Sequence, residues 1–224
     1  MVVVQAVPGA EVTVSIDGKS VEHKADVGSL SEPLPLAAGA HDLVFTGVPG
    51  SGRVTTRLDV KSGSNTDVVL HMPASVNGDP VVSTYRTPMS PIGPQKARVL
   101  LAHTATVAPA DVRVDGKVVF TNIANGEYAD ADVPAGPHRV ALLPTGATSD
   151  PILGPLTVTL QPRTVTMVYA VGNPSNGSMD AITHTLPLRA DGSVEPRSMD
   201  TGSAGLAGDV PVVPFGDGVA PSSG

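Results

Sequence analysis

Short runs in which apolar and polar residues alternate recur along the chain, separated by turns rich in glycine and proline. Near the N-terminus, Val12-Thr13-Val14-Ser15-Ile16 alternates with a period of two and is followed by Asp17-Gly18. This period places successive side chains on opposite faces of a β-strand. Asp-Gly between two such runs predicts a hairpin with a type I′ turn, in which both central residues have positive φ.

The second half of the chain shows the same pattern. Strands are expected over 98–102, 111–114, 117–120, 138–142, 156–160, 164–169 and 181–186. A turn is expected over 132–136, which reads Asp-Val-Pro-Ala-Gly. About seven short strands with a turn signal roughly every 8–12 residues are typical of an antiparallel sandwich.

The two halves are related by an internal repeat with an offset of nearly one hundred residues. The landmarks that recur in the same order are Asp17-Gly18-Lys19 with Asp115-Gly116-Lys117, Ala38-Gly39-Ala40-His41 with Ala135-Gly136-Pro137-His138, Leu58-Asp59-Val60 with Val158-Thr159-Leu160, and Asn77-Gly78 with Asn176-Gly177. Solenoid repeats run only about 20–50 residues. The offset therefore indicates the duplication of a whole domain.

This repeat predicts the organisation of the chain as an all-β protein. Two tandem antiparallel β-sandwich domains, immunoglobulin-like or transthyretin-like, are expected over 1–87 and 96–190. The segment 88–95 contains three prolines and is expected to be a semi-stiff linker. The segment 191–224, rich in Gly, Ser, Pro and Asp, is expected to be a disordered tail.

Composition narrows the classes of partner. The net charge of −7 argues against nucleic acid and against an anionic membrane surface, which both select clustered Lys and Arg. The chain has no cysteine and no apolar run long enough to insert into a membrane. Met1 runs directly into Val2-Val3-Val4, which predicts a mature protein from which a secretory signal has been removed.

The second half resembles a known family. The matching segments are 98–103, 109–117, 133–136 and the Thr-rich strand that ends in Ala170-Val171-Gly172. Together they look like the DUF4397 family over roughly 96–188, and the first copy fits less closely. The resemblance implies a duplicated, secreted or cell-envelope bacterial β-sandwich, with actinobacterial members among its relatives, and no assigned activity. Leu186-Pro187-Leu188-Arg189-Ala190 departs from the LPxTG sorting pattern at its fourth and fifth positions.

Histidines provide the candidate sites. His41 and His138 each follow an Ala-Gly turn and are expected to be partly exposed residues at the start of a strand. His103, near Asp111 and Asp115 in sequence, is expected to fix the 104–109 connection through a hydrogen bond. A role of His103 with Asp111 and Asp115 in ligand or metal binding is the alternative, and catalysis is a third reading.

Known catalytic patterns are missing from the sequence, so neither catalytic residues nor a cofactor or metal site is assigned. There is no Gly-x-Ser-x-Gly elbow, phosphate loop or calcium loop, and the six aromatic residues cannot line a sugar cleft. We therefore expect a non-enzymatic structural stalk or display module at the bacterial cell surface. Its partner would be another envelope protein or a wall polymer. An adhesion or ligand-binding module, acting through the inter-domain cleft near 88–94 or through a sheet edge, is the alternative, and an enzyme comes third.

Overall fold

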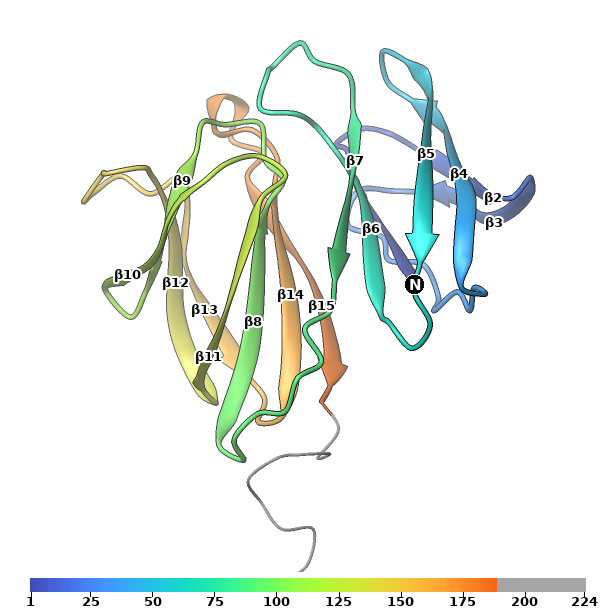
Figure 1. Ribbon diagram of the computed structural model, residues 1–224. Coiled ribbons are helices and arrows are strands. Elements are labelled where there is room, and N and C mark those ends of the chain that lie inside the picture. The colour runs from blue at the N-terminus through green and yellow to red at the C-terminus, as the bar shows by residue number, and fades with distance from the viewer. Residues whose placement is uncertain (189–224) are drawn as a thin grey trace, which may run out of the picture. The chain divides into compact units, whose positions relative to one another are not determined.

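Almost every described residue belongs to a β-strand or to a turn between strands. The computed structural model describes residues 1–188, and the tail expected at 191–224 lies outside them (Figure 1). Within the described part, the only helical element is one short 3-10 helix, η1 (Pro174–Asn176). The prediction of an all-β fold is confirmed.

The strands form two sequential sets, each of which builds two sheets. The first set is β1 (Val2–Ala6), β2 (Val12–Ile16), β3 (Lys19–Ala25), β4 (Gly39–Val48), β5 (Gly52–Val60), β6 (Thr66–His71) and β7 (Val81–Arg86). The second set is β8 (Lys96–His103), β9 (Ala110–Val114), β10 (Lys117–Ile123), β11 (Tyr128–Pro134), β12 (Gly136–Pro144), β13 (Leu153–Leu160), β14 (Thr164–Val171) and β15 (Asp180–Pro187). Sheets β3-β2-β4-β5 and β1-β6-β7 form the first sandwich, and sheets β10-β9-β12-β13 and β11-β8-β14-β15 form the second.

The two Asp-Gly hairpins form as predicted. Asp17 and Gly18 have φ values of 49° and 76°, and Asp115 and Gly116 have 49° and 81°. Both central positions of each turn thus have positive φ, as a type I′ turn requires. These turns connect β2 to β3 and β9 to β10.

Strand β11 corrects the sequence prediction, which places a turn over 132–136. β11 runs antiparallel to β8, from Tyr128 opposite Ala102 to Pro134 opposite Lys96. Its side chains are alternately half-buried and exposed. Pro134 is tolerated because it ends an edge strand, where a backbone N–H is not needed. The turn is reduced to Ala135, which separates β11 from β12.

One pair of strands in each sandwich is parallel rather than antiparallel. β1 pairs in parallel with β6, and β8 pairs in parallel with β14. The opening strands β1 and β8 each lie in one sheet of their sandwich, whereas the next two strands along the chain lie in the other sheet. The parallel partners, β6 and β14, come later, after the chain has returned to the first sheet. The remaining pairings are antiparallel, as expected.

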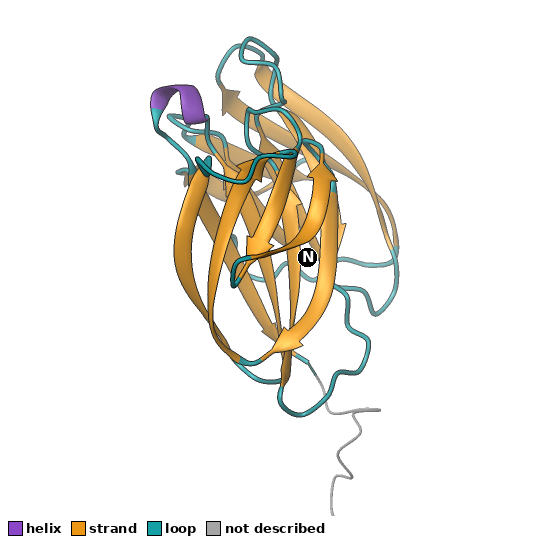
Figure 2. Cartoon of the chain, turned by 90° about the vertical axis from the view of Figure 1, so that its left-hand side faces the viewer, coloured by secondary structure: helices purple, strands orange, loops and turns teal. Residues whose placement is uncertain are grey.

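In the sheet β1-β6-β7, the strands β1 and β6 are buried on both faces. On one face, Val3, Val68 and Leu70 belong to the core of the first sandwich. On the other face, Val2, Val4 and Val69 belong to a second core, which they share with β8 and β14 of the second sandwich. Figures 1 and 2 show the strands of the two sandwiches stacked in this way. The two sandwiches are therefore joined through a continuous apolar core.

Candidate functional site

The Asp-Gly turn of the first sandwich is fastened to the start of β4 by Asp17. Its Oδ2 lies 2.7 Å from Nδ1 of His41, and its Oδ1 accepts a hydrogen bond of 3.0 Å from the backbone N–H of Asp42. The other ring nitrogen of His41 lies 2.9 Å from the carbonyl oxygen of Ala37. Both ring nitrogens are thus engaged, and His41 connects the turn to the segment that leads into β4.

The second sandwich repeats this arrangement atom for atom. Asp115 Oδ2 lies 2.7 Å from Nδ1 of His138, and Asp115 Oδ1 accepts a hydrogen bond of 2.8 Å from the N–H of Arg139. His138 Nε2 lies 2.8 Å from the carbonyl oxygen of Pro134. Two of the four recurring landmarks, Asp-Gly-Lys and Ala-Gly-x-His, therefore form one recurring Asp–His clamp, which holds a hairpin against the next strand.

The clamps shift the pKa values of both partners. The hydrogen bond to Asp17 raises the pKa of His41 above its ordinary value, and Asp115 does the same for His138. In return, the hydrogen bonds to His41 and to the N–H of Arg139 lower the pKa values of Asp17 and Asp115 respectively. Each clamp therefore favours the ion-paired form as the pH falls towards the ordinary pKa of histidine.

The three tyrosines meet where the two sandwiches touch. Tyr85 of β7 lies edge-on to Tyr128, with ring centroids 5.7 Å apart, and 5.5 Å from the ring of Tyr169. The Tyr169 hydroxyl donates to Oδ2 of the buried Asp67 on β6, and Nδ1 of His184 lies 2.7 Å from the same oxygen. Burial raises the pKa of the Tyr85 phenol to about 12. A polar contact thus lies inside the shared core and links the two sandwiches.

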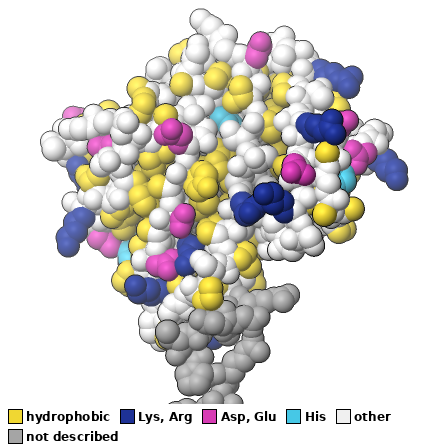
Figure 3. Space-filling view, in the orientation of Figure 1, with side chains coloured by type: hydrophobic (Ala, Val, Ile, Leu, Met, Phe, Trp, Pro, Cys, Tyr) yellow, Lys and Arg dark blue, Asp and Glu magenta, His cyan; other side chains and the backbone are white. Residues whose placement is uncertain are grey.

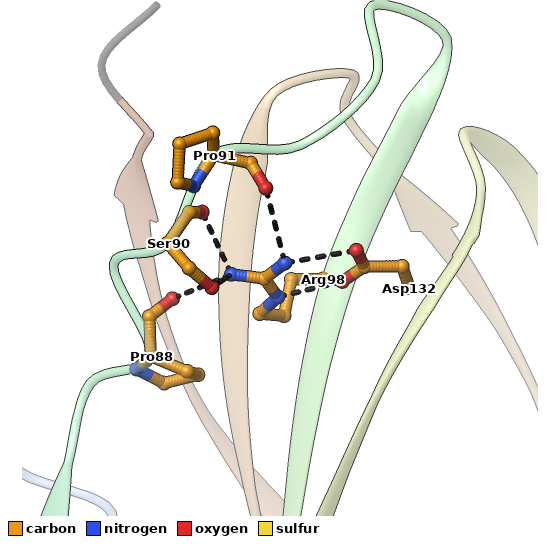
Figure 4. Close-up of polar contacts among 5 residues, drawn as sticks. All are labelled: Pro88, Ser90, Pro91, Arg98 and Asp132. Atoms are coloured by element: carbon orange, nitrogen blue, oxygen red, sulfur yellow. Dashed lines mark hydrogen bonds and ion pairs between the residues drawn. The ribbon is translucent and has the colours of Figure 1, made fainter. Parts of the chain in front are cut away.

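The segment between the sandwiches is held by one arginine. Arg98 on β8 is buried, and its Nε and one terminal nitrogen donate to both oxygens of Asp132, at 2.6 and 2.8 Å (Figure 4). The other terminal nitrogen donates to the carbonyl oxygens of Pro88 and Ser90 and to the Ser90 hydroxyl. The carbonyl oxygen of Pro91 accepts a longer bond of 3.4 Å. The planar guanidinium therefore fixes the proline-rich segment against β8 and β11.

A comparison with known protein families gives a match for the first part of the chain. A family model described as domain of unknown function (DUF4397) matches residues 1–110. The chain therefore contains a DUF4397 domain. A search of curated proteins found no match to the chain. The match spans the first sandwich, the proline-rich segment and β8, and ends where β9 begins. The family prediction is confirmed, whereas the resemblance assigned to the rest of 96–188 stays a prediction.

The structure does not bring together the three candidate residues His103, Asp111 and Asp115 of the second sandwich. His103 Nε2 lies 3.2 Å from the carbonyl oxygen of Ala108, within the 104–109 connection. Asp111 accepts hydrogen bonds from the N–H groups of Asn122 and Gly146, which lower the pKa of its carboxyl group. Asp115 is engaged by the second clamp instead. Each residue thus has local partners of its own, and a shared ligand role for them stays a prediction.

Two buried polar residues of the DUF4397 domain were not anticipated. His71 ends β6, where its ring nitrogens lie 2.8 Å from the carbonyl oxygen of Met72 and 2.9 Å from the Ser83 hydroxyl. Burial lowers the pKa of His71 to about 4, and burial also lowers the pKa of His103. The other residue is Asp67. Its position directly before the apolar run Val68-Val69-Leu70 was the available sequence signal for burial.

Other signs of chemistry are few in the part of the chain that the structure describes. No group of three or more His, Asp or Glu side chains in residues 1–188 is arranged to hold a metal ion. None of the helical residues in this range forms a segment long and apolar enough to cross a bilayer. The recurring and buried polar contacts in this range fasten turns and strands to one another.

Proposed function

We propose that this chain is a non-catalytic structural module of the bacterial cell envelope, which holds a surface or a partner at a fixed distance and orientation. The observation that carries this proposal is the core shared by the two sandwiches, which includes Val4, Tyr85, Leu100 and Met167. Burial of apolar surface on both sides of a middle sheet favours one relative placement of the sandwiches. A spacer benefits from such stiffness.

The Arg98 contacts support the same function. A proline-rich segment alone is only semi-rigid. Here a buried guanidinium also donates to three backbone carbonyl oxygens within 88–91. The segment is thereby tied to the second sandwich, and this leaves little freedom for a hinge. The alternative of ligand binding in a cleft beside 88–94 has less support, because Arg98 already occupies the inner side of this segment.

The distance between two spin labels tests the rigidity. The chain has no cysteine, so Ser62→Cys and Thr148→Cys would place one label on an exposed loop of each sandwich. Pulsed electron paramagnetic resonance should give a single narrow distance distribution. A broad or multimodal distribution would contradict the spacer function. A pair within the first sandwich, Ser62→Cys with Ser20→Cys, provides the width expected without inter-sandwich motion.

The location at the cell surface needs a separate test. Intact cells of the source organism can be treated with a protease that does not cross membranes, with a cytosolic protein as the control. Loss of this chain with survival of the cytosolic control is expected. Survival of both would contradict the envelope assignment while leaving the rigidity result unaffected.

A further inference from the structure

A cavity of about 120 Å³ lies between the two sheets of the second sandwich. The side chains that line it are aliphatic apart from Phe120, His138 and Thr183. Of these three, only His138 and Thr183 are polar. Thr183 is exposed on an edge strand, and both ring nitrogens of His138 are engaged with Asp115 and Pro134. The interior therefore offers almost no hydrogen-bonding partner. Figure 3 shows hydrophobic side chains gathered on the half of the molecule formed by this sandwich.

The first sandwich fills the corresponding space with larger side chains. Strand register gives the matched positions, because Phe45 lies opposite Val14 and Leu142 lies opposite Val112. The matched pairs in which the second sandwich has the smaller residue are Ile16 and Val114, Leu43 and Val140, Phe45 and Leu142, Leu58 and Val158, and Leu70 and Ala170. The first member of every pair is buried in the first core. The five smaller residues of the second sandwich all line the cavity.

Changes in the opposite direction also occur around the cavity, which is nevertheless open. Among the residues that line the cavity, the matched pairs with the larger residue in the second sandwich include Val3 and Leu101, Glu22 and Phe120, Val54 and Leu153, Thr56 and Leu156, and Val60 and Leu160. Leu156 is 41% exposed and lies at the edge of the cavity. Val119, on the other edge strand of the same sheet, is 43% exposed and also lines the cavity. The cavity therefore reaches the surface at apolar edges.

The segment that runs beside the first strand of each sandwich also carries smaller side chains in the second sandwich. In the first sandwich, Leu34 and Leu36 pack against the core. In the second, strand β11 brings Ala131 and Val133 to the wall of the cavity. The smaller side chains of β11 leave room where the first sandwich has leucine. Two separate segments thus remove volume from the same space.

We propose that the second sandwich binds a single hydrocarbon chain of a free, single-chain amphiphile in this cavity. Water is disfavoured there because it would lack polar partners, whereas apolar cavities of about 150 Å³ accept small hydrocarbons. The size fits one chain rather than two. The walls carry no charged side chain apart from the ring of His138, so the charged or polar head of the ligand would stay outside. This binding role is independent of the structural role proposed above.

A series of linear alcohols from 1-butanol to 1-decanol tests the proposal. Titration of the purified chain, followed by calorimetry, should show affinity rising about fourfold with each methylene group until the cavity is full, and then levelling off. Methyl NMR should show that Val140 and Val158 shift while Val14 and Val68 of the first sandwich do not. Absence of binding across the series would overturn the proposal, as would shifts confined to the first sandwich.

Variants that copy the first sandwich provide the specificity test. Ala170→Leu with Val140→Leu should weaken 1-octanol binding at least tenfold and leave the melting temperature unchanged or higher. The same chemical change outside the cavity, Val118→Leu, is the control because Val118 is exposed and does not line the cavity. If the double variant does not fold, Val158→Leu alone should still weaken binding. Undiminished binding by a folded variant would overturn the assignment to this cavity.

Vesicles of neutral phosphatidylcholine identify the source of the chain. If the amphiphile is bound as a free molecule, the protein should bind the alcohols but should not co-sediment with the vesicles. Co-sedimentation that Ala170→Leu abolishes would overturn the assignment to a free amphiphile, because the chain would then be taken from a bilayer.

Discussion

Tyr169 of the second sandwich donates a hydrogen bond of 2.7 Å to the carboxylate of Asp67 in the first, although the two residues are 102 positions apart. Asp67 is 1% exposed. A buried carboxylate is costly unless it is hydrogen-bonded, so this contact and the one from His184 compensate for its burial. The shared core is therefore specified by a polar contact as well as by apolar packing.

Removal of the phenol should weaken this junction. Tyr169→Phe keeps the ring but leaves Asp67 with one hydrogen-bond donor fewer, so unfolding free energy should fall by about 1–3 kcal/mol. Urea denaturation measures this change. Tyr128→Phe is the matched control, because Tyr128 is half exposed, and it should shift stability by less than about 0.5 kcal/mol. Equal effects of the two changes would show that the Asp67 contact contributes nothing.

The proline-rich segment should depend on the shape of the Arg98 side chain. Arg98→Lys keeps the positive charge, but an ammonium group cannot donate in a planar fork to Asp132 and to the carbonyl oxygens of 88–91. We expect a loss of about 1–3 kcal/mol and faster cleavage within 88–94 by a protease of broad specificity. Arg57→Lys, at an exposed position of β5, is the control. A cleavage rate unchanged from that of the parent would contradict the role of Arg98.

The histidines should titrate in two groups. NMR titration is expected to give pKa values above the ordinary range for His41 and His138, because each is hydrogen-bonded to an aspartate. His71 should titrate at about 4. Asp115→Asn should bring the pKa of His138 down while leaving that of His41 unchanged. A parallel shift of both histidines would mean that the two clamps are not independent.

Acid should destabilise the fold through His71 before the carboxylates are protonated. The folded-state pKa is depressed from 6.5 to about 4, so the neutral form is favoured by folding. Stability is therefore full above pH 6.5 and declines as the pH falls towards 4, by about 3 kcal/mol in total. The raised pKa values of His41 and His138 act in the opposite sense and offset part of this loss. Urea denaturation between pH 7.5 and 4 measures the slope.

A variant isolates the contribution of His71. His71→Gln has no titrating ring, so its stability should vary less with pH between 6.5 and 4 than that of the parent chain. The clamp of the first sandwich provides the comparison. Because the raised pKa of His41 stabilises the fold as the pH falls, His41→Gln should steepen the decline in stability rather than reduce it. An unchanged slope in His71→Gln would assign the acid sensitivity to other groups.

Local signals predicted the hairpins and most strands well. The range of β2 agrees with its alternating run, and both Asp-Gly turns have the required positive φ, because these features depend only on neighbouring residues. β11 was missed because Val-Pro-Ala-Gly indicates a turn, although Ala129, Ala131 and Val133 alternate with polar residues. Asp115 was associated with His103 by proximity in sequence. Its partner is His138, 23 residues further along the chain, and only the strand pairing brings them together.

The alternation of apolar and polar residues does not predict the core shared by the two sandwiches. Val2-Val3-Val4 and Val68-Val69-Leu70 are continuous apolar runs, which indicate strands buried on both faces. The alternating runs and the internal repeat by themselves predict two separate sandwiches. Which sheet covers the second face depends on packing between residues about 100 positions apart, such as Val69 and Met167. No local pattern specifies such a contact.

The sheet β1-β6-β7 makes the unit that folds larger than one sequence repeat. A shortened chain that ended in the proline-rich segment would expose the face of Val2, Val4 and Val69 that β8 and β14 now cover. Such a fragment should associate with other copies of itself or precipitate, rather than behave as a free monomer. The two halves carry matching sequence landmarks, but they should unfold together in a single cooperative transition.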